Sequence, residues 1–301
     1  MMVRVRTIIG SCPSEPTSDA HLPNRTVSVE FIGSPVEPPR NRILAALPTA
    51  EYERLRPGLD LVRLEVRDIV YDVGQRIERV FFVETGVLSI VAVMPDGSAV
   101  ETATVGYEGM LGVPVYLDSE QSATQAFCQV ATRALCMPTD VFRRAVTQQA
   151  TLRTILNRYT QALFMQVAQT SACNRLHPVR ERCARWLLQT HDRVESDEFL
   201  LTHDFLSQML GVRRATVTDA AGALQKQGLI EYEYGQIRIK DRAGLERASC
   251  ECYAIVRSEF DRLLNGRKTP SPLDGIHSSA NGKTTLNNGT PRRREPVSEE
   301  A

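Results

Sequence analysis

The stretch that decides the fold runs from Thr202 to Ile230 and reads THDFLSQMLGVRRATVTDAAGALQKQGLI. Its first part places apolar side chains on one face at helical spacing, and Thr202 is a residue type that caps helix N-termini. Gly211 tolerates the left-handed conformation that ends a helix and opens a tight turn. A second helix with an apolar face follows from Arg213, so the stretch predicts two helices joined by one turn.

A hairpin is expected directly after these helices. Gly228 ends the second helix, and the alternating run at 232–239 is broken at Gly235, which is typical of two short strands joined by a turn. Helix, turn, helix and hairpin predict a winged helix-turn-helix, whose second helix can enter the DNA major groove. An ordinary helical hairpin in a core is the alternative. The exposed face of the second helix starts with Arg213 and Arg214 and is otherwise small or hydroxylic, which favours DNA.

Composition limits the other possibilities. The 301 residues can hold two domains. The 36 lysines and arginines balance the 36 acidic residues, so bulk charge does not attract nucleic acid, although a few placed arginines suffice for a specific contact. No apolar run approaches the length of a membrane span, and the first residues lack the apolar stretch of a signal peptide. We therefore expect a cytoplasmic protein with no membrane partner.

The seven cysteines are scattered and form no CxxC pair. Such a set is typical of reduced thiols that pack as small core residues. Cys250 and Cys252 come closest to a motif, but two residues apart on one helix they would point to different sides. We therefore expect no catalytic residue, no metal ligand and no cofactor.

The chain changes character along its length. Short runs rich in valine, isoleucine and aromatic residues, separated by glycine turns, fill its first half and are typical of a β-sandwich or barrel. The segments that we expect are a mobile N-terminal segment at 1–40, a β-rich domain at 41–147, a long helix at 148–174, the winged helix-turn-helix domain at 175–243, a C-terminal helix at 244–264 and a disordered tail at 265–301.

The long helix at 148–174 is apolar on two sides, because a second apolar set lies beside a heptad-like seam. A helix of this kind has to bury both sides, one on the β-rich domain and one on a second copy of the chain. A helix that crosses the core of a monomer is the alternative. We assign the seam to a homodimer interface, which consists of Leu152, Leu156, Tyr159, Leu163, Gln166 and Thr170.

In this order of parts the sequence resembles the Crp/Fnr family of bacterial transcription regulators. The resemblance covers roughly Asn41 to Asp241 and is carried by Asp68-Ile-Val-Tyr-Asp-Val-Gly74, Val80-Phe-Phe-Val-Glu-Thr-Gly86, the Pro95-Asp-Gly97 turn and Leu201–Ile230. It implies an α+β fold: an N-terminal cyclic-nucleotide-binding-like β-roll of jelly-roll type that senses an effector, a dimerisation helix, and a C-terminal winged helix-turn-helix. It also implies a homodimer on a two-fold symmetric operator in double-stranded DNA, and contact with RNA polymerase for an activator.

The resemblance also gives roles to single residues. Arg214 matches the family arginine that reads a base edge, and a bidentate contact with guanine is the physical reason. Ala215 and Asp219 stand where the family often has a glutamate and a basic residue, so we expect a different operator, in which Asp219 accepts from a cytosine amino group. The predicted DNA-binding residues are Thr202, Arg213 and Thr216 at phosphate positions, together with Arg214, Thr218 and Asp219.

The effector pocket departs from the family. Relatives that bind cyclic AMP carry a glutamate for the ribose and an arginine for the cyclic phosphate. Val113 stands at the glutamate position and no arginine lies between Gly109 and Val130, so a buried phosphate would lack a cation. Cyclic AMP is therefore not expected as the effector. An iron–sulfur cluster is not expected either, because Cys12 stands alone near the N-terminus. The predicted pocket for an unknown signal, or none, consists of Met110, Leu111, Val113 and Thr124.

Two other classes of protein compete with a regulator. The balanced charge is compatible with a protein-interaction module that has a degenerate helix-turn-helix. A β-roll metalloenzyme would need histidines clustered in the roll at about 60–138. The histidines all lie outside that range, at His21, His177, His191, His203 and His277. We therefore expect a regulator and not an enzyme.

Overall fold

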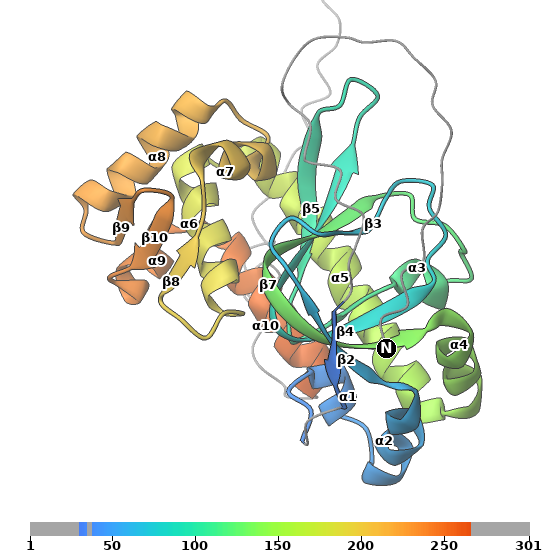
Figure 1. The fold of residues 1–301 in the computed structure, drawn as a ribbon. Coiled ribbons are helices and arrows are strands. Elements are labelled where there is room, and N and C mark those ends of the chain that lie inside the picture. The colour runs from blue at the N-terminus through green and yellow to red at the C-terminus, as the bar shows by residue number, and fades with distance from the viewer. Residues whose placement is uncertain (1–29, 35–37, 266–301) are drawn as a thin grey trace, which may run out of the picture.

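The computed structural model describes residues 30–34 and 38–265 (Figure 1). A β-roll lies at the centre, a long helix runs behind it, and a second, mostly helical domain lies to one side. The predicted α+β fold, with β-roll, long helix and helix-turn-helix in this order, is confirmed. The tail expected at 265–301 and most of the N-terminal segment expected at 1–40 lie outside the described residues. No helix among the described residues is both long and apolar enough to span a membrane.

The described strands of the roll form one antiparallel sheet in the order β1-β2-β7-β4-β5, with β3 on β7 and β6 on β4. The long strands β4 and β7 pair along most of their length, and register shifts near the middle of β4 let both bend around the core. Gly86 sits at this bend with φ +92°, and a Cβ there would lie 2.4 Å from the Ala131 carbonyl oxygen. The strands are β1 (Glu30–Gly33), β2 (Asp60–Leu64), β3 (Ile69–Tyr71), β4 (Arg79–Val93), β5 (Ala99–Val105), β6 (Met110–Leu111) and β7 (Gln125–Pro138).

Short helices close the ends of the roll. Asn41 caps the first of them by accepting from two backbone amides, and its own amide donates to the carbonyls of Val83 (2.9 Å) and Gly109 (2.7 Å). One buried side chain thus starts the helix and fixes it to the sheet. These elements are α1 (Arg42–Ala45), α2 (Thr49–Leu55), the 3₁₀ helix η1 (Arg56–Gly58), α3 (Val113–Tyr116) and α4 (Thr139–Gln148).

The long helix α5 (Ala150–Leu176) packs within its own chain on β5 and on the C-terminal helix α10 (Cys252–Asn265). The Tyr159 hydroxyl donates to the Met110 carbonyl at 2.9 Å, and the Gln166 amide hydrogen-bonds the Thr104 hydroxyl at 3.1 Å. The roll and α10 therefore cover the seam within a single chain, and its assignment to a homodimer interface stays a prediction. The residues buried in this way are Leu152, Leu156, Tyr159, Leu163, Gln166 and Thr170.

A different face of α5 is exposed. Phe164 has 75% of its surface accessible, and Val167, Ala168 and Ser171 are exposed with it. Counted from Phe164, the other three residues stand three, four and seven positions further on, so all four form one stripe along the helix. We call these four residues the open face of α5.

The second domain contains the helix-turn-helix. Its three described strands form an antiparallel sheet in the order β8-β10-β9, so the predicted hairpin gains a third strand from the segment before the first helix. Trp186 and Leu187 lie at the centre of its apolar core. The elements are α6 (Val179–His191), β8 (Glu198–Leu200), α7 (His203–Leu210), α8 (Arg214–Lys226), β9 (Ile230–Glu233), β10 (Gln236–Ile239) and α9 (Arg242–Ala248), followed by α10.

The two domains pack directly on each other. Phe205 of α7 meets Phe127 of the roll edge-on at 5.8 Å between ring centroids. The Trp186 indole donates to the buried Glu101 carboxylate at 2.9 Å. Arg193, just after α6, reaches into the roll and pairs with Glu108. These contacts hold the first helix of the helix-turn-helix against the β-roll.

Candidate nucleic-acid interface

The helix-turn-helix forms for the local reasons that the sequence shows. The Thr202 hydroxyl accepts from the Phe205 amide at 3.2 Å and caps α7. Gly211 ends α7 in the left-handed region at φ +61°. The next helix, α8, starts at Arg214 and buries one apolar face, which includes Val217 and Leu224. Its opposite face is left exposed.

Most of the residues predicted to contact DNA lie on the exposed face of α8, while Thr202 caps α7 and Arg213 directly precedes α8. The Arg214 guanidinium is 68% exposed and lies 3.3 Å from the Asp204 carboxylate, so this pair is solvent-screened and weak. Ala215 and Asp219 are exposed further along, and α8 lies on the outer side of the molecule, away from the roll (Figure 1). All the predicted residues are exposed: Thr202, Arg213, Arg214, Thr216, Thr218 and Asp219.

The structure adds residues that the sequence did not indicate. The His203 ring stacks on Tyr232 of β9 at 4.3 Å, and its Nδ1 lies 3.0 Å from the Thr218 hydroxyl. Burial, followed by the nearby Arg214 charge, lowers the pKa of His203 below its ordinary value. Thr218 is thus held by a neutral imidazole as well as by its bond to the Arg214 carbonyl. His203 and Tyr232 are far apart in sequence, so no local pattern could have paired them.

The hairpin tip is exposed while its basic residues are paired. Tyr234 stands at the turn between β9 and β10 with 97% of its surface accessible. Arg238 pairs with Glu198 and Glu231. The positive charge of Arg238 is therefore balanced by two carboxylates.

The residues of the predicted effector pocket lie in separate parts of the roll. Met110 and Leu111 are 0% and 3% exposed, because β6 pairs with β4 and both side chains fill the core of the roll. The role of these two residues in an effector pocket stays a prediction. Val113 and Thr124 are half-buried in separate segments, and their role stays a prediction.

A cation does reach the glycine loop, but it comes from another domain. The Arg193 guanidinium donates to both carboxylate oxygens of Glu108, the shortest contact being 2.7 Å, and to the Thr104 hydroxyl at 3.0 Å. A Cβ on Gly106 would lie 2.3 Å from the arginine side chain, so only glycine leaves room for it. Burial alone would raise the pKa of Glu108, but the Arg193 charge and hydrogen bonds outweigh it and lower the pKa. Arg193 is therefore fully paired within the protein.

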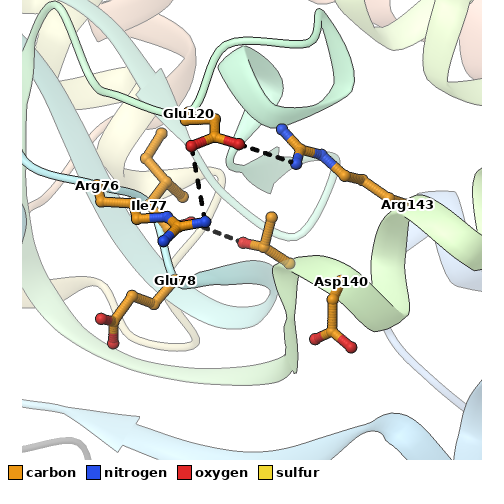
Figure 2. Close-up of a pocket in the computed structure, with 7 residues that line it drawn as sticks. Arg76, Ile77, Glu78, Glu120, Asp140 and Arg143 are labelled. Atoms are coloured by element: carbon orange, nitrogen blue, oxygen red, sulfur yellow. Dashed lines mark hydrogen bonds and ion pairs between the residues drawn. The ribbon is translucent and has the colours of Figure 1, made fainter.

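Figure 2 shows a polar pocket at another end of the roll, beside the start of α4. Glu120 lies between two arginines, 3.6 Å from Arg76 and 3.6 Å from Arg143. Glu78 and Asp140 also line the pocket, so its acids outnumber its bases. None of the predicted effector residues lines it. The arrangement suits a polar ligand with its own positive charge better than a phosphate.

Four possible metal ligands lie together at the junction of α5 and α6. The sequence argument against Cys250 and Cys252 assumed that one helix carries both. In the structure α9 ends at Ala248 and α10 starts at Cys252, so Cys250 lies on the irregular connection before the helix that Cys252 begins, and that premise is wrong. Cys173 and His177, at the end of α5, complete the group.

Two family models match the chain. The model of the cyclic nucleotide-binding domain matches residues 61–149, and that of the Crp-like helix-turn-helix domain matches residues 181–248. Together they cover just over half of the 301 residues. No curated protein matches the sequence.

Solved structures share the fold at low sequence identity. A protein from Eubacterium rectale assigned to the crp/fnr family of transcriptional regulators is 19% identical with a TM-score of 0.54, over 67% of this chain and 94% of that one. FixK2 from Bradyrhizobium japonicum is 17% identical with a TM-score of 0.55, over 64% and 98%. The c-di-GMP-responsive global regulator CLP from Xanthomonas campestris is 14% identical with a TM-score of 0.51, over 64% and 99%.

Proposed function

Because the chain belongs to the Crp/Fnr family of transcription regulators, we propose that it binds a specific, two-fold symmetric DNA operator as a homodimer. Each copy places α8 in the major groove of one half-site. The observation that carries the proposal is the exposed face of α8, which opens with Arg214. As a regulator it acts on DNA in the cytoplasm, has no enzymatic activity, and contacts RNA polymerase if it activates transcription.

The side chains of α8 support direct reading of bases. Arg214 is held only by a screened pair with Asp204, so its guanidinium can exchange that partner for a guanine edge. Ala215 and Gly222 lie on the same face and let the helix approach the bases closely. Asp219 can accept from a cytosine amino group and would repel a phosphate, so it favours a base contact.

The open face of α5 supports the homodimer. Phe164, with three quarters of its surface in water, and the exposed Val167 lie together on this face, and their helical neighbours Ala168 and Ser171 are small enough for a second helix to pack closely. A two-fold axis along α5 would bring two copies of Phe164 together. It would also set the two α8 helices to read half-sites whose centres lie about 34–36 Å apart.

The roll is proposed to respond to a signal other than cyclic AMP, or to none. A cyclic phosphate needs a cation once it leaves water. Among the described residues, Arg193 is paired with Glu108 and the arginines of the polar pocket share Glu120. Binding of cyclic AMP at either of these two places would have to break the pair that is there.

A gel-shift titration with DNA from the protein's own promoter region tests the proposal. Arg214→Ala should weaken specific binding by about 1–3 kcal/mol and relax the preference at one operator position. Arg247→Ala, an exposed arginine of α9, is the matched control and should bind like the parent. Equal binding by the parent and Arg214→Ala, or no specific binding by the parent, would favour a protein-interaction module instead.

A further inference from the structure

Three cysteines and a histidine from distant parts of the chain meet at the junction between α5 and α6. Cys173 lies in the last turn of α5 and His177 directly after it, while Cys250 lies on the connection between α9 and α10 and Cys252 is the first residue of α10. Their ligand atoms all lie within 4.8 Å of one another. The Cys173 and Cys250 sulfurs are 3.5 Å apart, and the Cys252 sulfur is 3.4 Å from Nδ1 of His177.

These distances fit a single tetrahedral ion. Zinc–sulfur and zinc–nitrogen bonds of about 2.3 and 2.0 Å give ligand–ligand edges of roughly 3.5–3.8 Å. The two shortest separations in the cluster are already at that value, so binding requires only small shifts of side chains. Each ligand comes from a well-packed element, and all three cysteines are buried.

The surroundings of the cluster are those of a metal site. His177 turns Nδ1 toward the Cys252 sulfur, and its Nε2 lies 3.1 Å from the Glu251 carboxylate. A carboxylate that accepts from the far nitrogen fixes the ring and makes the near nitrogen a better ligand. The Gln169 amide donates to the Cys252 sulfur at 3.1 Å, which stabilises a thiolate.

The charges around the cluster also favour thiolates. The positive charges of Arg185 and Arg182, both on α6, act on the Cys173 sulfur. The thiolate is the form that binds metal. Three thiolates with one divalent ion leave a single negative charge, which these two arginines of α6 can balance.

We propose that Cys173, His177, Cys250 and Cys252 bind one Zn²⁺ in a closed Cys₃His site. Four protein ligands leave no open position, so the role of the ion is structural. It ties the end of α5 to the connection that leads into α10. Helix α10 in turn packs on α5, where Phe260 lies 6.2 Å from Tyr159, and Asp261 pairs with Arg42 at 3.0 Å. The ion thus fixes the junction from which the DNA-binding domain extends.

Metal analysis of the full chain, purified with a thiol reductant and without chelator, tests the proposal. One zinc ion per chain is expected. After exchange for Co²⁺, the protein should show the thiolate-to-cobalt charge-transfer band and the intense visible bands of tetrahedral coordination. A reduced, folded protein that takes up no zinc overturns the proposal, as does a Cys173–Cys250 disulfide in place of metal.

Variants separate the site from general stability. Cys252→Ser should lose the ion, whereas Cys183→Ala, which changes a buried cysteine of α6 outside the cluster, should keep it. Glu251 is 64% exposed, so Glu251→Gln leaves the fold intact. It should weaken zinc binding by about 10–100-fold through the His177 ring. Parent-like zinc affinity in both Cys252→Ser and Glu251→Gln would contradict the assignment.

Any effect of the ion on operator affinity rests on the proposed DNA binding and is measured separately. Zinc-loaded and chelated protein are compared in the same gel shift. If neither form binds DNA while the ion is bound as expected, the proposed function fails and the metal site stands.

Discussion

Breaking the ion pair between Arg193 and Glu108 should strongly destabilise the joint between the domains. The two side chains are 7% and 8% exposed, and the arginine also donates to Thr104 and to the Gln189 carbonyl at 2.9 Å. Arg193→Ala removes every one of these bonds and leaves the buried Glu108 carboxylate without a countercharge, with the Gly106 amide at 3.1 Å as its remaining donor. Loss of one partner of a buried pair costs about 3–5 kcal/mol. Since a domain is stable by only about 5–15 kcal/mol, the variant should unfold far more readily.

Equilibrium unfolding in urea measures this loss. The chain has one tryptophan, Trp186, which lies at the same joint, so its fluorescence reports on the domain contact. Arg144→Ala is the matched control, because it removes an exposed, solvent-screened pair with Asp140 and should leave stability almost unchanged. Glu108→Leu combined with Arg193→Met should recover much of the loss, since no buried charge remains.

The pH dependence gives a second test of the pair. The pKa of Glu108 is lowered in the folded protein, so its contribution is present above the ordinary carboxyl pKa and is lost as the pH falls through the lowered value. In Arg193→Ala the isolated carboxyl should have a raised pKa, so that variant should gain stability as the pH falls. The difference in the free energy of unfolding between the parent and Arg193→Ala should therefore become smaller as the pH falls. If Arg193→Ala lowers the free energy of unfolding at neutral pH no more than Arg144→Ala does, the Arg193–Glu108 pair is not buried at the domain joint as described.

Three further predictions concern the dimer, the second buried carboxyl and the effector. Phe164→Glu should turn a dimer into a monomer in sedimentation, and a parent that is monomeric at micromolar concentration would already contradict the open-face interface. Burial raises the pKa of Glu101 to about 7, so stability should fall as the pH rises from the ordinary carboxyl value through 7. Glu101→Gln should abolish that fall in unfolding curves, and an unchanged slope would show that Glu101 is not its cause. Calorimetry should detect no micromolar binding of cyclic AMP, and clear binding would show that a paired arginine is released to hold the phosphate.

The parts of the fold that depend on neighbouring residues could be predicted from the sequence. The Thr202 cap, the left-handed Gly211 and the apolar face of α8 act within a few residues of each other, so the sequence contains all that is needed to place them. The exposed residues of α8 follow from the same periodicity.

The surfaces that pack against the apolar faces of α5 could not be predicted in this way. Periodicity shows that α5 has more than one apolar face, but not which surface each face meets. Helix α10 packs on the seam, and its distance in sequence from Leu156 or Leu163 hides that contact. Charging either of these two residues should therefore destabilise the monomer rather than separate a dimer.

The remaining surprises are pairings over long sequence separations. Arg193 reaches Glu108 from 85 residues away, and Cys173 lies 77 residues from Cys250. A search for cysteines or arginines within one segment misses both, because the fold and not the spacing brings the side chains together. The helix break between Ala248 and Cys252 also changed the expected directions of Cys250 and Cys252.

Selection of binding sites from random double-stranded DNA tests the central claim most directly. The account predicts that the enriched sequences share an inverted repeat with half-site centres about 10–10.5 base pairs apart, or a multiple of this spacing. It also predicts that Arg214→Ala loses the preference at one position in each half. Enrichment of no sequence, or of a single asymmetric site bound equally well by Arg214→Ala, would contradict a homodimer that reads DNA through α8.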